Sequence, residues 1–254
     1  MNVPDTVGFS VLAVVPVFNH GEMIAATTQG ILKHGIHCLL VDDGSHADCA
    51  AVLDALVRDD PVGLSLLRLD SNRGKGGAVM AGLREASRRG HSHVLQIDAD
   101  GQHRTDDIPG FIADARSNPG HVIVGKPVYD ASVPKGRLYG RYATHVWVWI
   151  NTLSFDIRDT MCGFRIYPLP PTIELIDAVP IGTRMQFDTE ILVRLYWRGV
   201  PVINRATPVA YPVDGVSHFR MLKDNVAISS MHARLFFGML ARLPARLLGY
   251  RWPR

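Results

Sequence analysis

The chain has 254 residues, enough for one sizeable domain but too few for two ordinary domains with a long linker. Its composition, 47% hydrophobic and 20% charged, excludes a disordered or fibrous chain, and a net charge of +3 is too small to indicate nucleic acid as the main partner. Three cysteines form neither a CxxC pair nor an even set, which favours a reducing compartment. Residues 1–10 lack a basic segment followed by an apolar run, so we expect a cytoplasmic protein.

The first half of the chain alternates strands with helices. Short apolar runs predict buried strands at 11–15, 36–41, 64–69, 93–97 and 121–125, and the segments between them predict helices at 21–34, 50–58 and 77–89. This alternation predicts a doubly wound α/β sheet that binds ligands at the carboxyl ends of its strands. Beyond about Pro127 the alternation weakens, and we expect a helix from Phe187, a strand at 201–211 and a helix at 226–248.

Two carboxylates, Asp98 and Asp100, follow the fourth predicted strand directly, with one small residue between them. Hard oxygen ligands suit Mg²⁺ or Mn²⁺, which would bridge two phosphates and neutralise a leaving diphosphate. Such a pair alone is more often a solvated acidic turn. Because Gln102 and His103 follow it, the pattern becomes much more specific.

Two further polar motifs end strands. The turn 42–45 can accept hydrogen bonds from a base or a ribose, or it can cap the next helix. The segment 72–77 joins a strand to a helix, where glycines let the backbone approach phosphate and Lys75 adds positive charge. It lacks the spacing of a Walker A loop, and the first strand ends without the glycines of a dinucleotide fingerprint.

Together, the motifs at 15–19, 41–45, 72–76, 98–103 and 159–165 resemble, in order, those of family 2 glycosyltransferases. The similarity covers roughly residues 11–215 and is nearest to the dolichyl- or polyprenyl-phosphate mannosyl- and glucosyltransferase branch. It implies a GT-A fold with a doubly wound mixed sheet, a divalent metal and inversion at the anomeric carbon. It also implies a donor of the GDP-mannose or UDP-glucose type and a lipid-linked acceptor, polyprenyl phosphate above all.

The resemblance assigns roles to residues of the first half. The nucleotide-sugar site would contain Pro16, Phe18, Asn19, Asp42, Asp43, Lys75 and Asp98, and the metal site Asp98, Asp100 and Gln102. Of these, Asp100 is also a catalytic candidate. The family often has Glu directly after the Asn, whereas this chain has His20, with Glu22 two places on. The choice between guanine and uracil is therefore left open.

Three residues are catalytic candidates on the acceptor side. We expect Arg165 to hold an acceptor phosphate, since a guanidinium binds phosphate oxygens bidentately, although it can also be a surface arginine. Asp188 and Glu190 lie where related enzymes carry an acidic residue near the acceptor. One of them would be the general base for a hydroxyl acceptor, whereas a phosphate needs little deprotonation. Both also suit the start of a helix, where the dipole favours carboxylates.

The segment 214–220 corresponds to a region that closes over the donor diphosphate in related enzymes, so Ser217, His218 and Arg220 are candidate phosphate contacts. The alternative is a plain surface loop. We expect a GT-A domain over 1–220 and an amphipathic, basic segment over 221–254. That segment either lies on the cytoplasmic, inner face of a membrane as a peripheral helix or docks on the enzyme's own core. Pro244 should end or kink its helix.

Other functions are less favoured. A sugar nucleotidyltransferase shares the architecture but normally has an amino-terminal loop rich in glycine with Arg or Lys, unlike the segment 16–19. A binding protein with a dead site would not need Asp98, Asp100 and Gln102 together. The alternative acceptor for a glycosyltransferase is a hydroxyl of a lipid or glycan.

Overall fold

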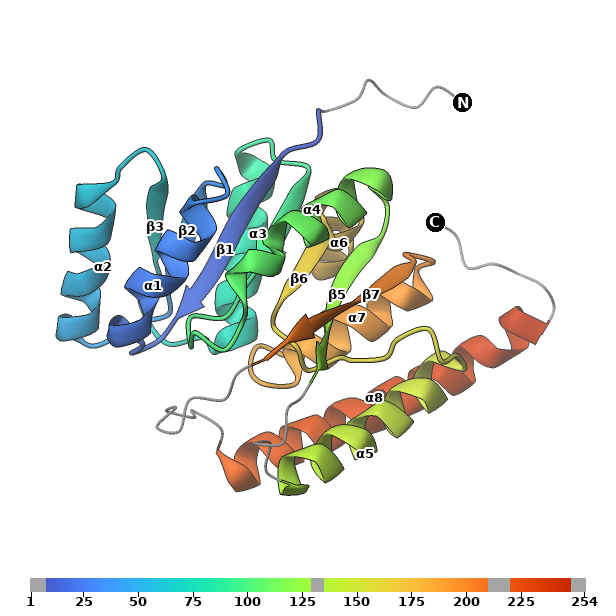
Figure 1. Ribbon diagram of the computed structural model, residues 1–254. Helices are drawn as coiled ribbons and strands as arrows, with labels where there is room; N and C mark the ends of the chain where they lie inside the picture. Colours follow the sequence, from blue (N-terminus) through green and yellow to red (C-terminus); the bar gives the residue numbers. More distant parts are fainter. Residues whose placement is uncertain (1–7, 129–134, 210–219, 248–254) are drawn as a thin grey trace.

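The structure is a computed structural model that describes residues 8–128, 135–209 and 220–247. Within these residues seven strands form one sheet in the order β3-β2-β1-β4-β6-β5-β7, with helices on both faces (Figure 1). The strands are β1 Val11–Val17, β2 Cys38–Asp42, β3 Leu64–Arg68, β4 His93–Gln96, β5 Val122–Val128, β6 Arg165–Pro168 and β7 Val202–Pro208. The helices are α1 Gly21–Leu32, α2 Ala47–Asp59, α3 Lys75–Arg88, η1 Thr105–Asp107, α4 Ile108–Ser117, α5 Lys135–Thr152, α6 Leu169–Ala178, α7 Phe187–Trp197 and α8 Met221–Leu247.

The prediction of a doubly wound, mixed α/β sheet is confirmed. The strands β3, β2, β1 and β4 are parallel to one another, and β5 is parallel to β7, whereas β6 runs antiparallel to both β4 and β5. All the predicted strands and helices are present, with ends shifted by a few residues. The sequence did not predict β6, α4, α5 or α6.

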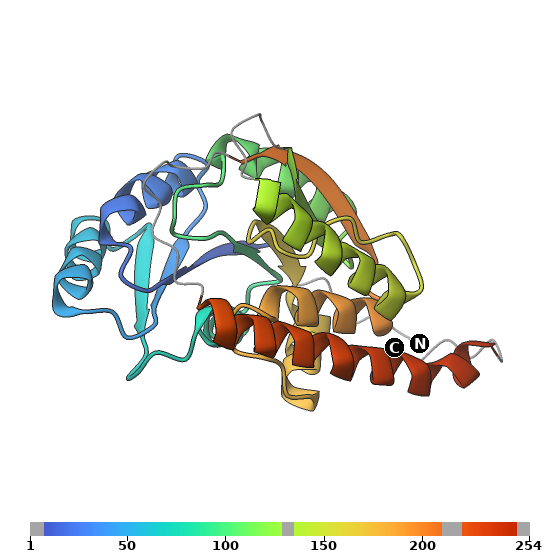
Figure 2. The same ribbon diagram turned by 90° about the horizontal axis from the view of Figure 1, so that it is seen from below.

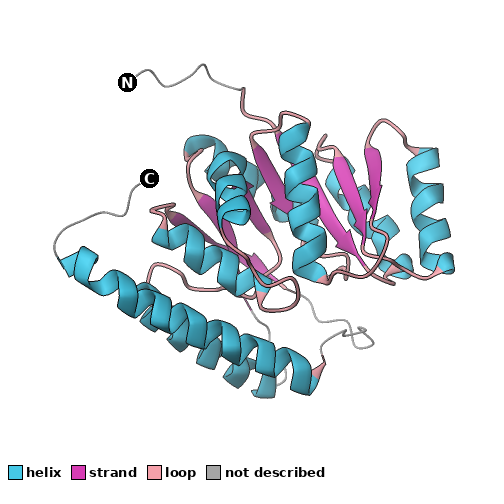
Figure 3. Cartoon of the chain, turned by 180° about the vertical axis from the view of Figure 1, so that it is seen from behind, coloured by secondary structure: helices cyan, strands magenta, loops and turns pink. Residues whose placement is uncertain are grey.

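Side chains from successive strand positions point to opposite faces of the sheet, and each face has its own apolar core. One core contains Leu12 and Val14 of β1 and is covered by α3, α6 and α7. The other contains Ala13 and Val15 and is covered by α1, α2 and α4. Because both faces are covered by helices (Figure 3), the central strands β1 and β2 are continuous apolar runs rather than alternating ones.

The last helix, α8, docks on the protein's own core. Met231, Leu235 and Met239 form a buried stripe along it, and α8 lies beside α5 (Figures 1 and 2). Of the two alternatives for this segment, α8 docks on the core, and it also exposes large apolar side chains such as Val226 and Phe237. Pro244 lies inside α8, which continues to Leu247, so of the two expectations for Pro244 the end of the helix is wrong and the kink stays a prediction.

Candidate functional site

The polar motifs gather at the carboxyl ends of the parallel strands. Pro16 lies in β1, and Phe18 and Asn19 follow that strand directly. Asn19 has a left-handed backbone, with φ of 58°, its N–H donates to Ser45 Oγ at 3.1 Å, and its Oδ1 accepts from the His46 N–H at 2.8 Å. The turn after β1 is thereby fixed to the turn after β2.

Asp42 and Asp43 stabilise turns and are almost completely buried. Asp42 accepts hydrogen bonds from the Ser45 N–H and from Arg68 Nε, both at 2.9 Å. Asp43 accepts from the backbone N–H groups of Arg73 at 2.7 Å and Gly74 at 2.8 Å. The turn-forming alternative is therefore realised, and neither carboxylate is presented to solvent for a base or ribose.

The Asp43 carboxylate fixes the glycine-rich segment in front of α3. Gly74 has φ of +84°, and a Cβ there would lie 2.6 Å from the Thr183 carbonyl oxygen. The Gly77 N–H also donates to that oxygen, at 3.0 Å. Glycine is therefore required at position 74 both by backbone conformation and by close packing.

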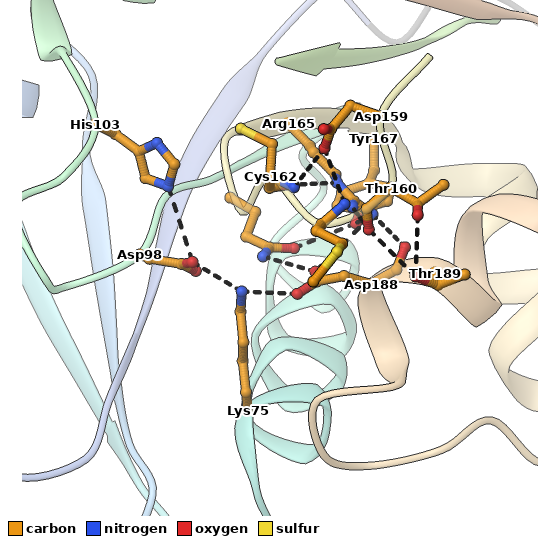
Figure 4. Close-up of polar contacts among 12 residues, drawn as sticks. Lys75, Asp98, His103, Asp159, Thr160, Cys162, Arg165, Tyr167, Asp188 and Thr189 are labelled. Carbon is orange, nitrogen blue, oxygen red and sulfur yellow. Dashed lines mark hydrogen bonds and ion pairs between the residues drawn. The ribbon is translucent and has the colours of Figure 1, made fainter. Parts of the chain in front are cut away.

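Lys75, the first residue of α3, joins two carboxylates from distant parts of the chain (Figure 4). Its Nζ lies 2.8 Å from Asp98 Oδ2 and 2.7 Å from Asp188 Oδ2. Burial acts to lower the pKa of Lys75, but the carboxylates of Asp188 and Asp98 together raise it above its ordinary value. The ammonium is therefore held charged between Asp98, an expected metal ligand, and the Asp188 carboxylate of α7.

The carboxylates of Asp98 and Asp100 have different environments. Burial acts to raise the pKa of Asp98, but Lys75 and the His103 ring, whose Nε2 is 3.8 Å from Oδ2, lower it below its usual value. For Asp100, burial and the Asp98 carboxylate raise the pKa. Its Oδ1 accepts a hydrogen bond from the Gln102 N–H at 3.0 Å. Without a cation between them, the negative charge of Asp98 makes ionisation of Asp100 less favourable.

These residues fit a divalent cation. Asp98 Oδ1 is buried and has no hydrogen-bond partner among the described residues, so an acceptor oxygen is left for a ligand. Carboxylate oxygens are the ligands that Mg²⁺ and Mn²⁺ prefer. Within the described part of the chain, no group of three or more His, Cys, Asp or Glu side chains is arranged to hold a metal alone. Asp98 and Asp100 would therefore need further oxygen ligands, such as phosphate oxygens, to complete the coordination.

Arg165 corrects a prediction, because it does not reach the surface. It is the first residue of β6, its exposed fraction is 0%, and its guanidinium is surrounded by protein acceptors. Nε donates to the Cys162 carbonyl at 2.7 Å, Nη2 to the Thr160 carbonyl at 2.6 Å, and Nη1 to the Asp188 carbonyl at 2.6 Å. With its donors used in this way, Arg165 has no group to offer an acceptor phosphate.

The two acidic candidates of α7 are also engaged. Asp188 Oδ1 accepts from Gln96 Nε2 at 3.3 Å, and its other oxygen is paired with Lys75. Glu190 is buried and accepts from the Gly182 N–H at 2.9 Å and from Arg194 Nη2 at 2.8 Å. Only Asp188 belongs to the site. Glu190 has the alternative, structural role at the start of the helix, and its prediction as a general base is wrong.

The remaining candidates lie elsewhere. Arg220 precedes α8, and its backbone N–H donates to Asp224 Oδ2 at 2.7 Å, so the structure does not bring it to Asp98 or Lys75 by any described contact. Ser217 and His218 lie outside the described residues. Cys162, from the same motif as Arg165, is buried in the protein, and burial raises the pKa of its thiol to about 12.

Sequence reasoning missed several buried polar residues behind the site. The Tyr167 hydroxyl donates a hydrogen bond to Gln96 Oε1 at 3.2 Å, and Asp159 accepts one from the Cys162 N–H at 2.8 Å (Figure 4). Asp159 also accepts a hydrogen bond from Arg141 Nη2 at 2.7 Å. A polar Gln96 between Leu95 and Ile97 in a buried strand was the available signal, because buried amides require hydrogen-bond partners.

Comparison with known proteins gives consistent matches. A family model described as "Glycosyl transferase family 2" matches residues 12–173. The dolichyl-phosphate beta-glucosyltransferase of Dictyostelium discoideum is 30% identical over 219 residues, which are 78% of this chain and 63% of that protein. The polyprenol monophosphomannose synthase of Mycolicibacterium smegmatis is 28% identical over 208 residues, which are 74% of this chain and 71% of that protein.

A solved structure agrees with the fold. Glucosyl-3-phosphoglycerate synthase from Mycobacterium tuberculosis, in complex with phosphoglyceric acid, superposes with a TM-score of 0.59 at 14% identity, covering 95% of this chain and 85% of that chain. At this identity the likeness shows the GT-A fold alone. The family model spans more than half of the chain and all five sequence motifs, and this places the protein among the glycosyltransferases, as a member of glycosyl transferase family 2.

Proposed function

We propose that the protein moves a hexose, with inversion at the anomeric carbon, from a nucleotide-diphosphate sugar to a polyprenyl phosphate. The donor is of the GDP-mannose or UDP-glucose type, and the metal is Mg²⁺ or Mn²⁺. The observation that carries the proposal is the meeting of Asp98, Lys75 and Asp188 beside the glycine-rich segment. The printed names of two relatives, a dolichyl-phosphate glucosyltransferase and a polyprenol monophosphomannose synthase, support a polyprenyl-phosphate acceptor.

The engagement of the acidic residues favours a phosphate over a hydroxyl as the acceptor. A hydroxyl acceptor needs a general base within reach of its proton. Asp188 is paired with Lys75, and Glu190 is buried against Arg194 and Gly182. A phosphate monoester is already anionic near pH 7, because its second pKa is about 6. It can therefore attack without a base.

The donor diphosphate is expected between Asp98 and the start of α3. A metal bound there would neutralise charge on the leaving diphosphate. Asp98 and Asp100 would hold that metal, together with Gln102 two residues after Asp100. Lys75 adds a positive charge 2.8 Å from Asp98, and the positive end of the α3 dipole favours the same anion.

The proposal includes a peripheral position on the cytoplasmic, inner face of a membrane. No helix in the described part of the chain is long and apolar enough to cross a bilayer. Instead, α5 and α8 lie side by side and expose large apolar side chains. On α5 these are Tyr142, Val146, Trp147 and Ile150, and on α8 they are Met221, Leu222, Val226, Phe237 and Leu240. Such helices bind at the interface of a bilayer through buried apolar area.

The test is a donor screen with Mn²⁺ and a short-chain polyprenyl phosphate, with products identified by mass spectrometry. We expect release of GDP or UDP together with a glycosylated polyprenyl phosphate. Transfer only to hydroxyl lipids would move the function to the alternative acceptor class. Release of pyrophosphate would indicate a nucleotidyltransferase, and no consumption of any donor would overturn the proposal.

A further inference from the structure

Arg165 links the segment before β6 to the carboxylates of the site from inside the protein. Its guanidinium bridges three backbone carbonyls, those of Thr160, Cys162 and Asp188. Two of them belong to the segment before β6, and the third belongs to the first turn of α7 (Figure 4). A planar fork of five N–H donors can satisfy acceptors in several fixed directions at once, which an ammonium cannot do.

Arg165 is connected to the site through its contacts with Asp188. Besides the bond to the Asp188 carbonyl, Arg165 Nη1 lies 3.9 Å from Asp188 Oδ1, an ion-pair distance. A second route runs from Nη1 to the Tyr167 hydroxyl at 3.2 Å, then to Gln96, whose amide donates to Asp188 Oδ1. Both the backbone and the side chain of Asp188 are therefore held from the Arg165 side.

The same carboxylate continues to Lys75 and Asp98. Asp188 Oδ2 is 2.7 Å from Lys75 Nζ, which is 2.8 Å from Asp98 Oδ2. The two cations and two carboxylates of this row have no net charge. Loss of either cation would leave a buried carboxylate uncompensated, and loss of the correct geometry would release Lys75 from its place between the two carboxylates.

We propose that Arg165 is a positioning residue. It fixes Asp188, and through Asp188 it fixes Lys75 against Asp98, so that Asp98 presents its unpartnered Oδ1 to the metal and the donor diphosphate. The inference rests on the proposed transfer reaction. It assigns Arg165 to the donor and metal side of the site, and it predicts no contact with the acceptor.

The first experiment compares Arg165→Lys with the wild-type protein, using Mn²⁺ binding followed by electron paramagnetic resonance and steady-state kinetics for both substrates. Lysine keeps the charge but loses the bridging of three carbonyls. We expect Mn²⁺ affinity about tenfold weaker, in line with the loss of an outer-shell partner. We also expect kcat to fall by about tenfold or more and the acceptor KM to stay within about twofold. Arg205→Lys, which alters an ion pair with Asp114 away from the site, is the control and should match the wild type.

A double-mutant cycle with Asp188→Asn tests the route. If Arg165 acts through Asp188, the Arg165→Lys change should weaken Mn²⁺ binding much less when Asp188 is already Asn. Additive effects of the two changes would overturn the inference, as would a higher acceptor KM with unchanged Mn²⁺ affinity. Wild-type protein that binds Mn²⁺ and consumes no donor would refute the proposed function instead, and the two failures are thereby distinguished.

Tyr167→Phe provides a milder variant in case Arg165→Lys does not fold. It keeps the buried ring and removes only the hydroxyl between Arg165 and Gln96. We expect a loss of Mn²⁺ affinity that is measurable but smaller than the loss of about tenfold for Arg165→Lys, with a normal acceptor KM, because only one of the two routes to Asp188 is lost. Unchanged Mn²⁺ affinity in a folded Tyr167→Phe protein would overturn the inference.

Discussion

Glu190 accepts a hydrogen bond at 2.9 Å from the backbone N–H of Gly182, and this contact ties α7 to the loop in front of it. The neighbouring Thr183 carbonyl accepts from the Gly77 N–H in the first turn of α3. Arg234 of α8 also lies 3.6 Å from the Glu190 carboxylate. The buried Glu190 carboxylate therefore connects the last helix, through one loop, to the glycine-rich segment.

For Glu190→Gln we expect a loss of stability rather than a loss of chemistry. The amide keeps the shape but loses the charge that pairs with Arg194, which should cost about 1–3 kcal/mol of the free energy of unfolding. The change in kcat should stay below about tenfold, whereas loss of a general base costs about 100-fold or more. Urea unfolding and transfer kinetics measure the two effects. Normal stability with kcat reduced by about 100-fold would restore Glu190 as a general base.

For Asp100→Asn we expect transfer and Mn²⁺ binding to be lost while the fold is kept. The amide removes a charge that the metal requires. Burial and Asp98 raise the pKa of Asp100, so removal of its charge should not lower the free energy of unfolding in the absence of metal. Asp106→Asn, on the exposed side of η1, is the control and should keep full activity. Full transfer by Asp100→Asn, or undiminished wild-type transfer in EDTA, would disprove the metal site.

The sequence predicted the strands that carry the site better than it predicted the directions of the side chains. β1 and β2 are continuous apolar runs that only a sheet covered on both faces can bury, so their positions and the motifs at their ends followed directly. β6 has only four residues and begins with Arg165, so it gave no periodic signal. A motif specifies that an arginine is present, but burial decides whether its donors meet a ligand or the backbone.

The contact between Lys75 and Asp188 was also beyond sequence reasoning. Both residues were candidates, but Lys75 begins α3 and Asp188 lies in the first turn of α7. Their distance depends on the packing of α3 and α7 on the same face of the sheet. Local patterns carry no information about such packing, and the pairing changed the expected role of Asp188 from a base to a partner of Lys75.

The seam between α5 and α8 should make the protein sensitive to acid. His232 is buried, its ring stacks on Trp147 with 5.9 Å between centroids, and burial lowers its pKa to about 4. The unfolded chain, with an ordinary histidine pKa of about 6.5, binds the proton more readily. Stability from this group is therefore complete above pH 6.5 and is lost as the pH falls from about 6.5 to 4.

We expect His232 to contribute about 3 kcal/mol to the loss of unfolding free energy over that range. Urea unfolding at several pH values measures the loss. His232→Phe keeps an aromatic ring beside Trp147 and should flatten the pH dependence between 6.5 and 4. An equally steep dependence in His232→Phe would show that other groups cause it.

The membrane proposal is tested on exposed side chains, because truncation of α8 would remove Met231 and Leu235 from the apolar core. Val226 and Phe237 of α8 are 69% and 68% exposed, so their replacement by glutamate leaves the buried stripe intact. A peripheral helix binds through buried apolar area and through attraction of basic residues to anionic lipid, about 1 kcal/mol for each basic residue near the surface. The double variant Val226→Glu with Phe237→Glu loses apolar area and gains repulsion. We expect it to sediment with anionic liposomes at least about tenfold less than the wild type, while donor hydrolysis in solution is unchanged.

Val62→Glu, at a side chain 78% exposed between α2 and β3, is the matched control and should bind normally. Equal loss of binding in both variants would indicate a general effect of added negative charge. A wild-type protein that does not bind liposomes at low salt would contradict the proposed position on a membrane surface.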